Sequence, residues 1–409
     1  MKTSALLTVL LLYSCGSIFA LTDTTEVIKN KPSIVFKGFV KSDYWYDTRQ
    51  VVASREELFL FYPKNIKLID RKDVHAEDYV NFSPVTSRLT GLICGPDAFG
   101  AKTSGMIEAD FSGVTNADIN GFRLRHAYGL LRWKQSELLF GQFWHPMFVT
   151  EVFPNVISLN TGAPFQPFIR NPQLSYTRFY KNMSVQLAIL AQRDNASDGP
   201  LGYNGVYMRN ALVPNVHVQV QYKLPSHVFG LAADWKTLRP RLASDSIITT
   251  DQISSYSGMA YWKYTHDSFV WRFKTIFGQN LTEHLLLGGY AVQQFDSLTG
   301  RETYTPTNHL FVWGNLQYGR KIVFGLFGGY AHNFGTSHEN TGKFYSRGAD
   351  IAYMYRVAPS ISWVSNKVQI SFEPEYTAAA YGKPDLKGVV QEIHEVANLR
   401  LLLTFFYFF

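Results

Sequence analysis

Charged side chains occur in pairs two positions apart at several places in the sequence. Arg123 and Arg125 form one basic pair, and Arg272 and Lys274 form another. Alternate residues of an extended strand point to the same side, so each pair presents two positive charges to one surface. If the two pairs share a surface, they form a basic wall that lowers the entry barrier for a small anion without any covalent chemistry.

Acidic residues show the same spacing. The acidic pairs are Glu108 with Asp110 and Glu373 with Glu375. We expect the first acidic pair on the strand beside Arg123 and Arg125, and the second near Arg356 and Arg400. Two interpretations are equally open. The carboxylates neutralise the cations in cross-strand pairs worth roughly 0.2–1 kcal/mol each, or the charges select the solute that enters.

The chain lacks the residue patterns of a catalytic, metal or nucleic-acid site. It contains no GxSxG segment and no convincing arrangement of serine, histidine and acid. The 11 histidines are scattered without the spacing of metal ligands. The net charge of +7 is spread singly rather than in a basic cluster. We therefore expect no enzyme, no metal, no cofactor and no nucleic-acid partner.

The charged pairs lie in segments that alternate apolar and polar residues. In the last segment, NLRLLLTFFYFF, alternate residues from Leu399 to Phe409 are apolar, whereas Asn398, Arg400 and Thr404 fall on the other face. One face of such a strand suits lipid and the other suits water. Aromatic residues reach 15% of the chain, as expected for belts of Tyr, Trp and Phe at two membrane interfaces.

Sixteen alternating segments can be counted, most of them about 9–14 residues long, which is the length of a tilted membrane-spanning strand. They lie near residues 34–47, 85–95, 102–112, 121–133, 137–145, 173–181, 184–194, 214–224, 227–237, 252–265, 269–279, 307–319, 321–333, 347–364, 367–380 and 396–409. A barrel with both chain ends on one side of the membrane needs an even number of strands. Leu285 to Val292 would be a seventeenth strand, so we place it in a loop.

The fold class that follows is all-β: a transmembrane antiparallel β-barrel of 16 strands spanning residues 34–409. A soluble β-sandwich would also show short strands and polar turns. A soluble barrel of this size, however, would enclose a large empty apolar lumen, which packing disfavours. With apolar side chains outward and polar ones inward, the pattern fits only a lipid surrounding, and unpaired edges in lipid require closure.

The longest connections carry the prediction of a constriction. The stretch 146–172 contains five prolines and is too long for a tight turn, and loops of this length are usually functional. We predict that it folds inward and narrows the pore. The polar residues then expected to face a solute are Glu151, Asn155, Asn160, Gln166 and Arg170. The alternative is that the loop only covers the mouth of the barrel.

His126 is an exception to the alternation, because its position in the strand predicts that it faces lipid. A histidine there is costly unless it is covered. Either an interface between protomers or the headgroup zone of the membrane could supply that cover.

The N-terminal residues predict export. A lysine, an apolar run and small residues up to Ala20 form a secretory signal peptide over residues 1–20, too short to span a bilayer. A lipoprotein signal with Cys15 as the lipidated residue is the alternative. Residues 21–33 then form a short extension before the barrel. Cys94 is the only cysteine left after cleavage at Ala20, so no internal disulfide is expected.

Several segments resemble a known family. They are GFRLRHAYGLL, GQFWHPMFVTEVFPNVISLNTGAPFQPFIRNPQLSYTRFY, FGQNLTEHLLLGGYAV and FGLFGGYAHNFG. The chain resembles DcaP-like outer-membrane porins and, more distantly, the phosphate-selective porins O and P, from Gly38 to Phe409. The resemblance implies a 16-stranded barrel, usually a homotrimer, in the outer membrane of a Gram-negative bacterium. It also implies passage of small anionic solutes such as dicarboxylates. The best-known members of the family carry a helical coiled-coil extension before the barrel, whereas here residues 21–33 alone are expected between Ala20 and the first strand.

The resulting hypothesis is a porin that lets small hydrophilic, mainly anionic solutes diffuse passively. Its expected partners are outer-membrane lipid, the solutes, two further copies of the chain and the barrel-assembly machinery, which would read the terminal strand ending at Phe409. Two alternatives are a barrel enzyme of the phospholipase or protease type and a dedicated substrate-specific channel. The residues predicted to line the pore are Glu108, Asp110, Arg123, Arg125, Arg272, Lys274, Arg356, Glu373, Glu375 and Arg400.

Overall fold

The computed structural model describes residues 32–193 and 195–409. The predicted signal peptide at residues 1–20 and most of the predicted extension at 21–33 lie outside these residues. Strands dominate the described part, and its one α-helix is α2, Val206–Ala211. No helix among the described residues has the length and apolar character needed to cross a membrane.

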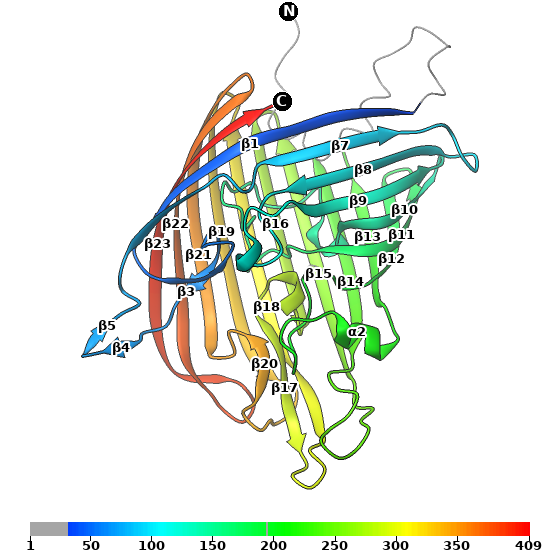
Figure 1. Cartoon of the computed structure of the whole chain (residues 1–409). Helices are drawn as coiled ribbons and strands as arrows, with labels where there is room; N and C mark the ends of the chain where they lie inside the picture. Colours follow the sequence, from blue (N-terminus) through cyan, green and yellow to red (C-terminus); the bar gives the residue numbers. More distant parts are fainter. Residues whose placement is uncertain (1–31, 194) are drawn as a thin grey trace, which may run out of the picture.

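The wall is a closed antiparallel β-barrel of 16 strands (Figure 1). The second strand is interrupted and consists of β6 and β7. The strands of the wall are β1 (Ser33–Asp47), β6 (Tyr79–Ser83) with β7 (Arg88–Cys94), β8 (Lys102–Asp110), β9 (Arg123–Arg132), β10 (Ser136–Trp144), β11 (Arg170–Tyr180), β12 (Met183–Leu190), β13 (Asn215–Lys223), β14 (His227–Leu238), β15 (Ile253–His266), β16 (Phe269–Gln279), β18 (Glu302–Gly319), β19 (Ile322–Thr336), β21 (Ile351–Ser365), β22 (Val368–Pro384) and β23 (Val390–Phe408). This confirms the predicted fold class and strand count.

The barrel closes between its first and last strands. β1 pairs with β23 in antiparallel register, from Phe39 opposite Phe408 to Asp47 opposite Arg400. Short turns connect strands at one end, the top of Figure 1, where β1 begins and the C-terminus lies. Longer loops with the small strands β4 (Leu68–Ile69) and β5 (Lys72–Asp73) and helix α2 lie toward the other end.

The segment predicted as a loop at Leu285 to Val292 contains a strand outside the barrel wall. β17 (Gly288–Phe295) pairs with β18 on one side and with β20 (Phe344–Arg347) on the other. β16 pairs directly with β18 in the wall, so β17 adds nothing to the strand count. The three strands form an extension at the long-loop end (Figure 1). The prediction of a loop was wrong locally, although the parity on which it rested is confirmed.

Side chains alternate across the wall as predicted. On β23, Leu401, Leu403 and Phe405 are 37–39% exposed, whereas Arg400 and Thr404 are buried at 1% and 0%. In a membrane, lipid would cover the outward apolar side chains. In the isolated barrel nothing covers them, so they are exposed. The terminal segment therefore presents one apolar and one polar face.

A β-bulge on β9 overturns the prediction for His126. Glu108 of β8 lies opposite His126, but the next residue, Ala109, lies opposite Leu124, so Arg125 is an extra residue in β9. Because a bulge shifts the alternation by one position, Arg125 and His126 both point inward. His126 is 2% exposed and its Nε2 lies 3.7 Å from Glu108 Oε1. It therefore faces neither lipid nor a neighbouring protomer.

Three connections enter the barrel and pack against each other inside it. They are residues 57–63, which include β3 (Phe59–Pro63), residues 145–169 between β10 and β11, and residues 280–287 after β16. Phe59 and Phe168 lie 5.3 Å apart between ring centroids, and Trp144 stacks on Phe148 at 3.9 Å. Together with wall residues they form one buried apolar cluster. The inserted segments thus occupy part of the lumen.

Candidate functional site

The segment 145–169, which we call the inward loop, is held by the barrel wall opposite its own strands. Lys274 on β16 donates hydrogen bonds to the backbone oxygens of Met147 and Phe148, at 3.0 and 2.8 Å, and to Gln166 Oε1 at 2.9 Å. Lys274 is fully buried. The loop therefore folds inward, and this predicted pore-lining cation is used to anchor it.

The two carboxylates of β22 anchor the same loop by accepting hydrogen bonds. Glu373 accepts from the backbone N–H groups of Ile157 and Ser158 at 2.8 and 2.9 Å. Glu375 accepts from Asn160 Nδ2 at 2.9 Å. A buried carboxylate needs such donors, because its desolvation is otherwise uncompensated.

Arg356 on β21 joins two of the inserted segments. Its guanidinium donates to Ala163 O of the inward loop at 2.7 Å and to Phe61 O at 2.9 Å. It also lies 3.5 Å from Glu375, as the sequence predicted.

Arg400 on β23 makes similar contacts. It forms an ion pair with Asp47 at 2.7 Å and donates to the backbone oxygens of Glu57 at 2.7 Å and Leu58 at 3.3 Å. The interior cations of β21 and β23 thus hold inserted backbone, which a sequence reading based on strand faces does not reveal.

The arginine and acidic pairs of β8 and β9 meet as expected. Arg125 lies 2.8 Å from Glu108 and 2.7 Å from Asp110, and Arg123 lies 2.9 Å from Asp110. This geometry supports the interpretation as cross-strand neutralisation.

The two basic pairs do not form one wall. β9 and β16 are separated by the six strands β10–β15. On β16, Arg272 points to its neighbour β18, where it donates to Asn315 Oδ1 at 3.0 Å and Gln317 Oε1 at 3.3 Å. The expected continuous basic surface is therefore absent from the described barrel.

The predicted polar residues of the inward loop mostly turn away from solvent. Asn160, Gln166 and Arg170 are each no more than 1% exposed. Asn155 is half-buried, and its backbone N–H donates to Asn315 Oδ1 at 3.0 Å. Only Glu151 of the five lines the main cavity. The others serve the packing of the loop against the wall.

That cavity has a volume of about 730 Å³ and lies between the inward loop and strands β10–β13. Turn residues Lys181 and Asn182 (β11–β12), and Leu224 and Pro225 (β13–β14), are part of its lining, so it reaches the short-turn end of the barrel. A volume between roughly 300 and 1,000 Å³ is typical of a small-molecule site.

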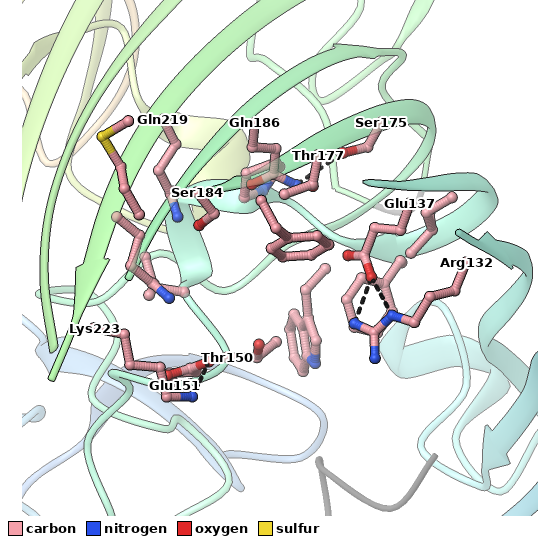
Figure 2. Close-up of a pocket in the computed structure, with 18 of the residues that line it drawn as sticks. Arg132, Glu137, Thr150, Glu151, Ser175, Thr177, Ser184, Gln186, Gln219 and Lys223 are labelled. Atoms are coloured by element: carbon pink, nitrogen blue, oxygen red, sulfur yellow. Dashed lines mark hydrogen bonds and ion pairs between the residues drawn. The ribbon is translucent and has the colours of Figure 1, made fainter. Parts of the chain in front are cut away.

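Ion pairs flank the cavity. Arg132 lies 2.6 Å from Glu137 at one side, and Lys223 of β13 lies 3.1 Å from Glu151 of the inward loop at another. Figure 2 shows the two pairs at separate edges of the pocket, with uncharged polar side chains between them. The remaining charged residue of the lining is Lys181, in the turn.

Uncharged polar side chains form the wall of the cavity on three adjacent strands. They are Gln173, Ser175 and Thr177 of β11, Ser184 and Gln186 of β12, and Gln219 and Gln221 of β13. Phe143, Trp144 and Phe179 supply aromatic surface. The residues predicted to line the pore are all charged, so this uncharged strip was not among them. The alternation of Gln173, Ser175 and Thr177 in NPQLSYTRFY is the signal that could have found it.

Three histidines that are far apart in the sequence meet beside the inward loop. His145 begins the loop, His217 lies on β13 and His284 lies in the segment 280–287. The ring of His145 lies 5.5 Å from that of His217 and 4.6 Å from that of His284, and all three are buried. Asp234 on β14 lies directly opposite His217.

Hydrogen bonds account for the ring of His145 without an ion. Potential ligand atoms of His145, Asp234 and His284 lie within 4.8 Å of one another. The backbone N–H of Met147 donates to His145 Nδ1 at 3.2 Å, and His145 Nε2 lies 2.8 Å from Asn215 Oδ1. Since both ring nitrogens of His145 are occupied, we assign the cluster to loop attachment rather than to a metal.

Several solved structures share this fold at low sequence identity. The outer membrane channel DcaP of Acinetobacter baumannii has a TM-score of 0.67 at 14% identity, covering 93% of this chain and 98% of that chain. An anion-selective porin from Comamonas acidovorans has a TM-score of 0.55 at 10% identity, covering 93% and 100%. The outer membrane protein OmpT of Vibrio cholerae, in its trimer form, has a TM-score of 0.54 at 9% identity, covering 93% and 100%.

No family model matches this chain, and no curated protein sequence matches it. The comparison therefore establishes the fold, and it confirms the resemblance to the DcaP channel at that level.

Proposed function

We propose that this chain is a porin: a water-filled channel for the passive diffusion of small hydrophilic solutes across the outer membrane of a Gram-negative bacterium. The observation that carries the proposal is a polar cavity beside a loop folded into a closed barrel whose outer face is apolar. The neighbours described as outer-membrane channel and porin support it. The barrel provides the path, and the inward loop limits its width.

Planar lipid bilayers test this function. Purified protein added to one side should give stable stepwise conductance in potassium chloride, because a water-filled lumen conducts ions. Protein denatured before addition is the control. A folded barrel that never conducts, even with the inward loop loosened by Lys274→Met, would contradict the proposal.

A preference for anions has weaker support. One neighbour is an anion-selective porin, and three basic and two acidic side chains line the cavity. Four of these five are paired with each other. We therefore expect at most a weak anion preference, measured as the reversal potential under a salt gradient.

Arg123 and Arg125 stay candidates for ion selectivity, because both are positively charged side chains of β9 that pair with Asp110 inside the barrel. Their replacement by glutamine should shift the reversal potential toward cations if they act on passing ions. An unchanged potential would assign them a structural role only.

The proposed assembly is a homotrimer inserted by the barrel-assembly machinery, with the strand ending at Phe409 as its signal and lipid around the apolar face. The trimer form of the V. cholerae protein supports the trimer. Mass measurement of the complex in detergent tests it, and a stable monomer would contradict it.

A barrel enzyme is the second candidate. It would need a nucleophile next to a base, and across residues 32–193 and 195–409 no serine hydroxyl is hydrogen bonded to a histidine. Phospholipid hydrolysis by the purified protein would favour this candidate over the porin.

A further inference from the structure

We propose that the cavity beside the inward loop binds uncharged, polyhydroxylated solutes of the sugar class, an inference that rests on the proposed function and names the solute. Four steps support it: the chemistry of the lining, its unused hydrogen-bonding groups, the placement of its charges and its aromatic surface.

The lining offers donors and acceptors together. Each glutamine amide carries a donor and an acceptor, and each hydroxyl can act as either. A sugar hydroxyl is itself both donor and acceptor, so it can pair with any of them. A dicarboxylate accepts only, so it could use the donors of this strip but would leave the glutamine carbonyl oxygens, such as that of Gln186, without a partner.

Part of this capacity is unused by the protein. Gln221 Oε1 accepts from Tyr261 at 2.9 Å, which leaves its amide nitrogen as a donor. Gln186 donates to Ser175 Oγ at 2.8 Å, which leaves its oxygen as an acceptor. Within the described chain, the hydroxyls of Thr177 and Ser184 form no hydrogen bond to another protein group.

Four of the five charged side chains of the lining form ion pairs at its edges, and the fifth, Lys181, lies in the turn between β11 and β12. The pairs Arg132 with Glu137 and Lys223 with Glu151 neutralise each other at the edges of the pocket (Figure 2). Paired charges leave little net field between them, so a solute in the middle of the cavity gains little from carrying a charge.

Aromatic rings in the lining provide apolar surface for the C–H faces of a sugar. Phe143 and Trp144 lie at the end of β10, and Phe179 on β11, all in the same lining. The C–H faces of a sugar ring are apolar and can pack on such rings while its hydroxyls bond to the amides.

Current block in planar bilayers tests the inference, with maltose and succinate as probes. We expect maltose to reduce the potassium chloride current in a saturable way, and succinate at equal concentration to reduce it less. The combined variant Thr177→Val, Ser184→Ala and Gln221→Met removes hydrogen-bonding groups without changing charge. It should weaken maltose block about tenfold, which corresponds to about 1.4 kcal/mol.

Gln294→Met is the matched control, because Gln294 lies on β17 outside the wall and is exposed. It should leave the block unchanged. If the combined variant does not fold, Ser184→Ala alone should still weaken the block, about twofold or more.

Three outcomes overturn the inference: maltose reducing the current no more than polyethylene glycol of equal size, succinate blocking more strongly than maltose, or the same maltose block in the variants as in the unchanged protein. These outcomes all require a potassium chloride current. If the porin proposal itself is wrong, no such current is seen at all.

Discussion

The ammonium group of Lys274 lies within 3.0 Å of three oxygen atoms of the inward loop. Lys274→Met removes all three hydrogen bonds. Phe148 O and Gln166 Oε1 still accept from Gln166 Nε2 and Trp313 Nε1, but Met147 O loses its donor, and an unsatisfied buried acceptor costs roughly 1–3 kcal/mol. The loop should therefore detach more often from β16. We expect larger and noisier single-channel conductance.

Lys321→Met is the control for this change, because Lys321 is exposed in a turn. Conductance steps of unchanged size and noise in Lys274→Met would show that the three hydrogen bonds do not hold the loop in place.

His145 links the inward loop to the wall in its neutral form. Burial lowers its pKa to about 4, and burial also lowers the pKa of His284. Asp234, His217 and Lys236 are the other charged or titratable groups facing it. An unfolded histidine titrates near 6.5, so the unfolded chain binds the proton first. The stability that neutral His145 contributes is complete above that value and is lost as the pH falls from about 6.5 toward 4.

The loss is about 3 kcal/mol for this residue alone. Thermal unfolding in detergent between pH 7 and pH 4 measures it, and His145→Gln should flatten the dependence of the midpoint on pH. His266→Gln, at an exposed position, should not. Equal pH slopes in all three proteins would contradict the prediction.

At the scale of residues, the sequence predicted which charges meet but not what they do. Arg125 with Glu108 and Arg356 with Glu375 follow from alternation on neighbouring strands. The partners of Lys274 come from a loop more than 100 positions away. No local pattern encodes such a contact, so the use of interior cations as loop anchors could not be read from spacing.

Strand β10 contains a position, Gly141, whose backbone conformation and close neighbours favour glycine. Its φ is +118°, and a Cβ there would lie 2.3 Å from Ala127 O. Gly141→Ala should therefore destabilise the barrel by roughly 1–3 kcal/mol, because the backbone is strained for any other residue. Gly258→Ala is the matched control, since its Cβ would meet nothing closer than 4.0 Å.

Heat-dependent migration on SDS gels measures this difference, because folded barrels migrate differently from unfolded chains. Equal unfolding temperatures for the two variants would contradict the role of Gly141.

At the scale of elements, local alternation predicted the wall strands to within a few residues at most positions. Alternation gave the wrong result where the pairing between strands determines the local structure. The bulge that turns His126 inward depends on the register between β8 and β9. β17 is hydrogen bonded to β18 on one side and to β20 on the other. This pairing makes the segment a strand, although its residues are as typical of a loop as of a strand.

The apolar outer face is a property of the whole molecule. Leu403, five positions before the end of β23, faces outward and is 38% exposed. Leu403→Arg should cost roughly 2–4 kcal/mol in a bilayer, whereas Tyr407→Arg near the strand end should cost roughly 0–1 kcal/mol. Equilibrium unfolding from lipid vesicles measures both. Equal costs would mean that depth in the bilayer does not govern this face.

The pairing of β1 with β23 also dictates when the barrel can exist. Asp43 and Thr404, which are hydrogen bonded across this seam, are 361 positions apart. β23 follows all the other wall strands in the sequence and seals the first one, so the nascent chain has two open edges until β23 has been made. Such edges invite pairing with other chains, and contacts this distant in sequence form slowly. The unfolded chain must therefore be kept from pairing with other copies of itself on its way to the bilayer. The pairing of β1 with β23 closes the barrel there in a late step.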